Sequence, residues 1–416
     1  MNPFDRRQFL KLCMSGAAIA AAPFSVSAAT TAPRVVVIGG GFAGATVAKY
    51  LRLWGGNIDV TMIDPAAAHI SCIGSNLVLN SRASLSSLTL SYNTLINTHG
   101  VKVMKDSAVS VDPLARRVYL ASGARLDYDR LIVAPGIDFL SIPGLDPNIM
   151  PHAWKAGSQT LLLKKQLEAM PDGGKFVLTI PPAPYRCPPG PYERVCVVAD
   201  YISRKKPKSK VIVLDANADI MAEKHTFSTA FNGIYANIVE YHTGVTISAA
   251  DSSRKELTTS IGTIQGNVVN VIPTQQAGKI VFDTGLVPAG ARWAPVNPLS
   301  YESTVVPGVH ILGDSQGTGQ PKSGHMANAQ AKVCADAILR SFAGLAPDAA
   351  PKTNSACYSP ITYDTASWLT VVFAYDPASG TMKAVPGTLT EAPMPTKDNF
   401  EQMFGWMANM FSDSFA

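Results

Sequence analysis

Charged residues are scarce in this chain of 416 residues. Asp, Glu, Lys and Arg make up 16% of it, and the formal net charge is only +5. A charge this small, scattered along the chain, does not indicate a nucleic-acid-binding protein. Hydrophobic residues account for 47%, which excludes an intrinsically disordered chain and predicts a well-packed protein of two or three domains.

The sequence also lacks a hydrophobic run long enough to span a bilayer. The apolar run 12–22 follows a twin-arginine sequence at Arg6 and Arg7 and precedes small residues that end at Ala28. These features predict a twin-arginine signal peptide over residues 1–28 and a location in the periplasm. Because this export route carries folded proteins, a tightly bound cofactor is also expected. An uncleaved anchor helix is the alternative.

Cysteine is infrequent, and its spacing excludes two kinds of site. The six cysteines form no C-x-x-C-H sequence, so no c-type haem is expected on this chain, and no Cys/His spacing resembles a metal site. Cys13 lies in the predicted signal peptide. The other cysteines are odd in number, so at least one serves a purpose other than an intramolecular disulfide. They are Cys72, Cys187, Cys196, Cys334 and Cys357.

The N-terminal part contains a dinucleotide-binding fingerprint in its full context. The β-branched run Arg34–Ile38 predicts a buried parallel strand, and Gly39, Gly41 and Gly44 follow it where a helix is predicted to begin. These glycines allow a tight turn and the close approach of a pyrophosphate to the helix N-terminus. A second predicted strand ends at Asp64, which would accept hydrogen bonds from ribose hydroxyls.

Two later elements favour FAD over NAD as the nucleotide. One predicted strand runs into Ala134 and Gly136 in an A-P-G sequence, and another, 309–312, runs into Gly313 and Asp314. Elements of this kind recur in flavoproteins with two dinucleotide folds, where the aspartate contacts the ribityl chain of FAD. The FAD-binding domain is therefore predicted to be discontinuous.

The middle of the chain repeats the strand pattern without a second glycine-rich turn. Predicted strands at 175–180 and 211–215 flank the proline-rich stretch 180–194, which holds too many prolines for a helix interior or a central strand. We interpret it as a stiff loop that presents Cys187 and Glu193, with a plain linker as the alternative. The missing phosphate loop disfavours NAD(P)H as the electron donor.

These patterns predict an α/β fold with two Rossmann-like dinucleotide-binding domains, of the glutathione-reductase type, and a C-terminal α+β interface domain. The second Rossmann-like domain lacks a nicotinamide phosphate loop. The predicted boundaries are 29–140 with 268–343 for the FAD-binding domain, 141–267 for the second domain and 344–416 for the C-terminal domain.

Four stretches make the chain resemble a known family. They are 151–157, 186–194, 273–279 and 321–325. The sequence resembles the flavoprotein subunit of flavocytochrome c sulfide dehydrogenase, which is related to sulfide:quinone oxidoreductase among the disulfide oxidoreductase flavoproteins. The resemblance extends over essentially the whole chain after the predicted signal peptide.

In that family FAD is attached through a cysteine thioether in a T-C-x-x-S-N sequence. Residues 71–76 match it with Ser71 in place of threonine, so the resemblance implies a covalent link at Cys72. Such a link prevents loss of the flavin in the periplasm and raises its potential. Without the resemblance, a small buried cysteine would be the preferred interpretation.

The resemblance also implies a redox-active disulfide beside the flavin. Cys187 matches its first cysteine, and Cys357, in the stretch 354–359 with one extra residue, matches its second. Cys357 is implied to be the sulfur that faces the flavin. Cys334 is the alternative partner, but it lies on a small-residue helix face and, like Cys196, is interpreted as a buried packing residue.

Three further residues receive roles from the resemblance. Glu193 is implied to lie near the flavin, where an apolar setting would raise its pKa and let it accept the proton of HS⁻. The alternative for Glu193 is a surface ion pair with Arg194. Lys322 is expected to contact the cofactor, and Trp406 is expected to pack beside the flavin and face a cytochrome partner.

The implied activity is FAD-dependent oxidation of sulfide to zero-valent sulfur or polysulfide, with electrons passed to a c-type cytochrome subunit that carries the haem. One alternative is a sulfide:quinone oxidoreductase, but the last predicted helix contains Glu401 and Asp413 and no Lys or Arg, unlike a helix lying on anionic lipid. The other is an accessory flavoprotein of a thiosulfate-oxidising system that acts by thiol exchange. An NADH-dependent disulfide reductase is disfavoured.

Overall fold

A five-stranded parallel sheet organises the N-terminal part of the protein. In the computed structural model, which describes residues 32–416, the strand order is β19-β9-β1-β2-β5. The predicted signal peptide lies outside the described residues. All neighbouring strands in the sheet are parallel: β1 (Arg34–Ile38), β2 (Asp59–Asp64), β5 (Lys102–Lys105), β9 (Arg130–Val133) and β19 (Val309–Ile311).

Both faces of this sheet are covered, which explains the uninterrupted apolar run in β1. Val35 and Val37 pack with helices α2 (Phe42–Gly55) and α8 (Gly324–Phe342), while Val36 and Ile38 pack into a separate cluster on the opposite face. Ser323 caps α8, because its hydroxyl accepts a hydrogen bond from the amide of Met326 at 3.1 Å.

The second parallel sheet has the order β13-β12-β11-β17. It consists of β11 (Lys175–Ile180), β12 (Lys210–Asp215), β13 (Val239–His242) and β17 (Val268–Val271), and its helices are α4 (Ser158–Ala169), α5 (Gly190–Lys205) and α6 (Lys224–Asn232). The two parallel sheets confirm the predicted fold class.

The chain crosses twice between the two sheets. β19 pairs with β9, so a segment after the second sheet returns to the first one, as predicted. The predicted start of that return at residue 268 is wrong, because Val268 lies opposite Phe176 and the whole of β17 pairs with β11. The β-branched run of β17 would suit a strand of either sheet. Only its pairing with β11 shows that it belongs to the second sheet.

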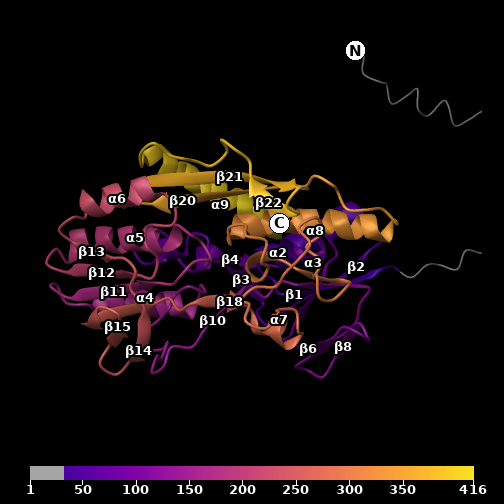
Figure 1. The fold of residues 1–416 in the computed structure, drawn as a ribbon, viewed down its shortest axis with the longest axis horizontal. Coiled ribbons are helices and arrows are strands. Elements are labelled where there is room, and N and C mark those ends of the chain that lie inside the picture. Colours follow the sequence, from indigo (N-terminus) through magenta and orange to yellow (C-terminus); the bar gives the residue numbers. More distant parts are fainter. Residues whose placement is uncertain (1–31) are drawn as a thin grey trace, which may run out of the picture. The chain divides into compact units, whose positions relative to one another are not determined.

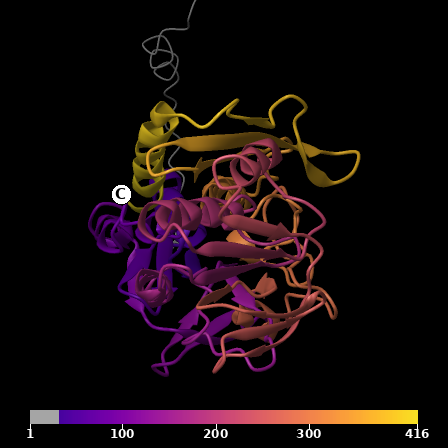
Figure 2. The ribbon, with the colours of Figure 1, turned by 90° about the vertical axis from the view of Figure 1, so that its left-hand side faces the viewer.

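The C-terminal segment forms an antiparallel sheet and a long helix. Its elements are β20 (Lys352–Pro360), β21 (Ala366–Asp376), β22 (Thr381–Ala384), β23 (Thr390–Glu391) and α9 (Lys397–Phe415). Figures 1 and 2 show this layer on one side of both parallel sheets. β20 contacts α8 of the first sheet and α5 of the second, so it lies where the two units meet.

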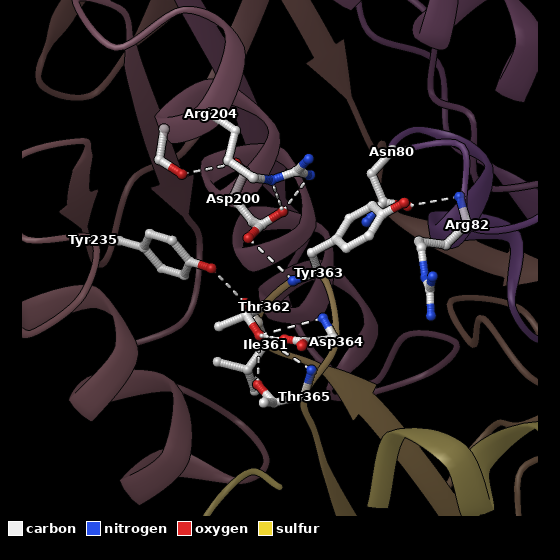
Figure 3. Close-up of polar contacts among 11 residues, drawn as sticks. Asn80, Arg82, Asp200, Arg204, Tyr235, Ile361, Thr362, Tyr363, Asp364 and Thr365 are labelled. Carbon is white, nitrogen blue, oxygen red and sulfur yellow. Dashed lines mark hydrogen bonds and ion pairs between the residues drawn. The ribbon is translucent and has the colours of Figure 1, made fainter. Parts of the chain in front are cut away.

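The turn between β20 and β21 is anchored on the second sheet's helices (Figure 3). The hydroxyl of Tyr235 donates to the carbonyl of Ile361 at 2.5 Å, and the amide of Tyr363 donates to Asp200 at 3.1 Å. Arg204 donates to the same carboxylate at 2.6 Å and lies over the ring of Tyr363, 4.3 Å from its centroid. These contacts hold β20 in place relative to α5.

The remaining elements are short. They are β3 (Ala68–Ile70), β4 (Thr89–Ser91), β6 (Ala108–Asp112), β7 (Arg117–Leu120), β8 (Arg125–Asp127), β10 (Ile137–Phe139), β14 (Ile247–Asp251), β15 (Glu256–Thr259), β16 (Gly262–Gln265), β18 (Gln275–Ala277), α3 (Asn93–Asn97), α7 (Lys279–Asp283), η1 (Ser75–Val78), η2 (Ser86–Leu88) and η3 (Gly313–Ser315). Across residues 32–416, no helix has the length and apolar character needed to cross a membrane.

Candidate functional site

The proline-rich stretch holds Cys187 in an uncommon backbone conformation. Cys187 has a φ of 58°, in the left-handed region that side chains other than glycine seldom adopt. Its amide donates to the carbonyl of Lys322 at 2.6 Å, and its carbonyl accepts from the amide of Gly190 at 2.8 Å. A side chain at Gly190 would place a Cβ only 2.8 Å from the Cys187 sulfur. The loop therefore fixes this sulfur in one position, as predicted.

The stretch is a loop only in its first part. α5 begins at Gly190, so Glu193 lies in the first turn of a helix and not in the predicted loop. Pro189 precedes this helix and Pro191 lies in its first turn, where proline's missing amide costs nothing. The prediction failed here because the run of prolines obscures where the helix begins.

Cys357 lies on β20 and faces Cys187. All five cysteines among the described residues are thiols in this structure. Hydrogen bonding to Cys357, followed by burial, raises the pKa of the Cys187 thiol. The predicted pairing thus joins two cysteines that are in contact, and the disulfide itself stays a prediction. Cys196 and Cys334 lie in separate hydrophobic clusters, which confirms them as buried packing residues.

Glu193 is a buried carboxyl group next to the two sulfurs. Burial raises its pKa to about 8, although the Asn76 amide and the charge of Arg194 act in the opposite direction. An acid with such a pKa can change protonation state near neutral pH, as a general base must. The geometry and the electrostatics therefore both suit the role that the resemblance implied.

Arg194 forms no surface ion pair with Glu193, so that alternative is wrong. It is 1% exposed, and burial lowers its pKa to about 9. Its guanidinium donates to Asn76 at 2.8 Å, to the carbonyl of Ala153 at 2.7 Å and to Asn270 at 2.9 Å. Arg194 therefore acts as an internal link between η1, α5 and β17.

Most of the predicted reactive residues line one cavity. Its lining includes Cys72, Cys187, Glu193, Cys357 and Trp406. The lining comes from several distant parts of the sequence: the loop after β3 with η1, Trp154, the stretch from Arg186 into the start of α5, the start of α8, β20 and α9. The arrangement brings a candidate flavin attachment point to the same space as two sulfurs and a base.

The glycine turn has the close packing that a pyrophosphate site needs. A Cβ at Gly39 would collide with the carbonyl oxygen of Ala134, and one at Gly44 would collide with the carbonyl of Gly39. Gly41 precedes the first residue of α2. Asp64 accepts hydrogen bonds from the Gly40 amide at 2.7 Å and the Ala66 amide at 2.8 Å, so it also supports the turn.

The far end of the predicted FAD site contains an unpaired buried acceptor. Within residues 32–416, Oδ1 of Asp314 is buried without a hydrogen-bond partner, and burial raises the pKa of this carboxyl group. Gly313 has a φ of 66°, which glycine tolerates. The carbonyl of Gly136 accepts from Ser315 at 2.6 Å and ties the two turns together. A ribityl hydroxyl would satisfy Asp314, so these residues fit FAD.

Lys322 and Trp406 differ in how directly they reach the cavity. The ammonium of Lys322 donates to the carbonyl of Gln316 at 2.5 Å and lies 3.8 Å from the ring centroid of Trp293. It is not among the lining residues, so its flavin contact stays a prediction. The indole of Trp406 lines the cavity and donates to His325 at 3.4 Å.

Several residues that build this site had no predicted role. Asn76 donates to the carbonyl of Gly190 at 3.1 Å and also accepts from Arg194. Trp154 and Arg186 line the cavity, with the guanidinium of Arg186 bonded to the carbonyl of Trp154. Trp154 and Arg186 lie inside stretches that carried the resemblance, and Asn76 lies in the stretch 71–76 that matches the flavin-attachment sequence. The resemblance was thus the available signal, but the contacts among these residues are not visible in the sequence.

Family models match three segments that together span most of the chain. Residues 160–273 match the model described as sulfide dehydrogenase [flavocytochrome c] flavoprotein chain, central. Residues 33–179 match pyridine nucleotide-disulphide oxidoreductase, and residues 349–415 match flavocytochrome c sulphide dehydrogenase, flavin-binding. The last model covers β20 and α9, which line the cavity.

Comparison with individual proteins finds similarity to the same kinds of flavoprotein. The chain is 53% identical over 45 residues to the sulfide dehydrogenase [flavocytochrome c] flavoprotein chain of Chlorobaculum thiosulfatiphilum, a match that covers 11% of this chain and 94% of that relative. It is 21% identical over 335 residues to the mitochondrial sulfide:quinone oxidoreductase of Dictyostelium discoideum, covering 75% of this chain and 72% of that one.

Solved structures share the fold at low identity. The sulfide:quinone oxidoreductase of Aquifex aeolicus superposes with a TM-score of 0.74 at 16% identity, over 92% of each chain. A NAD-dependent persulfide reductase from A. fulgidus gives a TM-score of 0.60 at 14% identity, over 92% of this chain and 77% of that one. On the family models and the Chlorobaculum relative together, the chain belongs to the family of flavoprotein chains of flavocytochrome c sulfide dehydrogenase.

Proposed function

We propose that the chain oxidises sulfide to zero-valent sulfur or polysulfide through a Cys187–Cys357 disulfide and passes the electrons through FAD to a c-type cytochrome partner. The observation that carries this proposal is the contact between these two cysteines beside the buried Glu193, in the cavity that Cys72 also lines. The twin-arginine sequence at Arg6 and Arg7 supports action in the periplasm.

The disulfide is the electrophile of the proposed reaction. HS⁻ attacks one sulfur, a new S–S bond forms, and the other cysteine leaves as a thiolate. Glu193 in its ionised form accepts the proton of the bound sulfide. When bound, FAD would accept the two electrons that are released as the two cysteines form their disulfide again and the added sulfur atom leaves as zero-valent sulfur or as part of a polysulfide. The residues that would hold it are the Gly39–Gly44 turn, Asp64 and Asp314, with a thioether at Cys72.

The direct test is addition of sulfide to the flavin-loaded chain without oxygen, followed by a c-type cytochrome. Loss of the oxidised flavin absorbance and then reduction of the cytochrome are expected. Reduction of a quinone but not of cytochrome would favour the quinone oxidoreductase. A flavin that sulfide leaves oxidised, but that exchanges disulfides with a thiosulfate-oxidising complex, would favour the accessory role.

Covalent attachment of the flavin is expected to depend on Cys72 alone. After denaturing precipitation, the peptide that contains Cys72 should retain the mass of the flavin, because a thioether survives unfolding. Cys72→Ala should release all FAD into the supernatant, while Cys334→Ala should retain it, since Cys334 lies in the core of the first sheet. Free FAD from the unsubstituted chain would contradict the thioether.

Sulfide-dependent flavin reduction should rise with pH because Glu193 must be ionised to act as a base. At constant HS⁻ concentration, we expect an inflection near the pKa of about 8. Glu193→Gln should lower the rate by about 10²–10⁴-fold and remove the inflection. Glu401→Gln, at an exposed position of α9, is the matched control. A persistent inflection in Glu193→Gln would assign it to another group.

Protein stability gives a second readout of the same carboxyl group. Its pKa is raised above the unfolded value, so the folded state keeps the proton to higher pH. The free energy of unfolding should therefore decline as the pH rises from about 4.5 through about 8. Glu193→Gln should flatten that decline, and equal slopes in the two proteins would contradict the raised pKa.

A further inference from the structure

Two cavities of the protein meet at Cys72 and Arg186. The first, here called the reaction cavity, is the one lined by Cys187 and Cys357. The second, the nucleotide cavity, has a volume of about 280 Å³ and is lined by Asp64, the predicted ribose acceptor. Among their lining residues, only Cys72 and Arg186 belong to both. A dinucleotide held at Asp64, with its ring beside the sulfurs, would therefore pass between these two side chains.

The backbone around Arg186 is fixed by distant segments. Its amide donates to Oε1 of Gln275 at 2.8 Å, and its backbone forms an isolated parallel bridge with Lys322. The guanidinium donates to the carbonyl of Trp154. Three segments that are far apart in the sequence thus hold Arg186 at the junction of the two cavities.

The guanidinium of Arg186 has no carboxylate partner among the described residues. Lys155, which also lines the nucleotide cavity, is paired with Asp138 at 3.3 Å. The charge of Arg186 lowers the pKa of Asp314, but within residues 32–416 the two side chains form no ion pair. Arg186 is half-buried, and a cation that is withdrawn from water without a counter-ion is unfavourable. An anion is therefore expected at the junction.

The thiol of Cys72 is the group at the junction that can become this anion. Burial raises its pKa, and the charge of Arg186 is the largest influence that lowers it. Asp314 and Cys187, the other titratable groups that act on it, raise its pKa. A cysteine beside an arginine is readily ionised, and the thiolate is the nucleophilic form. Without Arg186, only a backbone hydrogen bond would favour ionisation of Cys72.

We propose that the chain attaches its own FAD, with Arg186 stabilising the Cys72 thiolate that adds to the 8α-methyl carbon of the bound flavin. The inference rests on the proposed function, which includes a thioether at Cys72. It adds a second activity, self-attachment of the cofactor, and it gives Arg186 a role in that activity.

The attachment balances without a further reactant. Cys72 loses its thiol proton, the 8α-methyl group loses one C–H proton, and a C–S bond takes the place of the S–H and C–H bonds. The two electrons that this bond formation releases reduce the flavin ring, which takes up the two protons. Oxidised FAD is thus the oxidant of its own attachment, and the product is a chain with a reduced, thioether-linked flavin.

The test is synthesis of the full chain from purified translation components, with FAD and without oxygen, followed by mass measurement of the Cys72 peptide over time. The unsubstituted chain should gain the mass of the flavin. Arg186→Gln keeps a donor for the carbonyl of Trp154 but loses the charge. It should attach flavin at least about tenfold more slowly, since a rise of about one unit in the thiol pKa lowers the thiolate fraction about tenfold.

Two further variants separate the charge from the packing. Arg186→Lys keeps the positive charge and should recover most of the rate. Lys165→Met removes an exposed cation of α4 that lines neither cavity, so its rate should equal that of the unsubstituted chain.

The dependence on FAD and on pH distinguishes this role from simple binding of the cofactor. The lower rate of Arg186→Gln should persist at saturating FAD, because the missing charge acts on Cys72 and not on affinity. Arg186→Gln chains that hold unattached FAD should attach it faster as the pH is raised, because alkali forms the thiolate without the guanidinium.

Three outcomes would overturn the role of Arg186: an unchanged rate in Arg186→Gln, an Arg186→Lys chain as slow as Arg186→Gln, or a loss of rate that saturating FAD abolishes. Attachment that occurs only after a cell extract is added would overturn self-attachment. In each of these cases the thioether of the proposed function stands. Flavin that remains free in every sample, with or without extract, would instead reject the thioether and the inference with it.

Discussion

Cys357→Ser is expected to abolish sulfide-dependent flavin reduction, by more than about 10³-fold, while the flavin remains bound. Serine has nearly the same shape as cysteine but cannot form the S–S bond that HS⁻ attacks. Cys187→Ser should have an equal effect, because either substitution removes the same bond. The measurement is the rate at which the flavin absorbance falls after sulfide is added without oxygen.

A control variant is needed to tell whether a lower rate comes from the missing disulfide or from disturbed packing. Cys334→Ala removes a thiol that is fully buried in α8, so it tests whether loss of any buried sulfur reduces the rate. We expect its rate to equal that of the unsubstituted chain. Turnover of Cys357→Ser at the unsubstituted rate would reject the disulfide mechanism, and loss of the flavin from the variant would show that Cys357 supports cofactor binding.

The fold could be predicted largely because local patterns are strong in the first sheet. The run Arg34–Ile38 followed by glycines specifies a strand, a turn and a helix, with the expected acid at Asp64. The boundary at 268 could not be predicted, because β17 has no local feature that distinguishes the two sheets. Strand pairing over long sequence separations decides such cases.

In the site, as in the fold, features that depend on neighbouring residues could be predicted, whereas contacts between distant segments could not. Cys187 could be found from its unusual neighbours, and its contact with Cys357 was implied only through resemblance, since 170 residues separate them. Arg194 was misread as a candidate surface residue because a charged side chain is seldom fully buried. Its acceptors lie on segments distant in the sequence.

Arg194→Met is expected to lower the free energy of unfolding by about 2–4 kcal/mol. Methionine fills similar space but leaves three buried acceptors without their donor: Oδ1 of Asn76, Oδ1 of Asn270 and the carbonyl of Ala153. Each unsatisfied group costs about 1–3 kcal/mol. Part of that sum is offset because the variant no longer buries a charged guanidinium. The pKa of Arg194, which burial lowers to about 9, shows that this burial is unfavourable.

The loss should appear as a lower denaturant midpoint, with Lys205→Met as the matched control on the same helix. Lys205 is exposed, so its substitution should change the free energy of unfolding by less than about 0.5 kcal/mol. Arg194→Met should also lower the fraction of chains that carry flavin attached at Cys72, because Asn76 belongs to the segment that carries Cys72 and loses the donor that orients its amide. Equal midpoints for the two variants would mean that water satisfies the three acceptors and that Arg194 does not link η1 to α5.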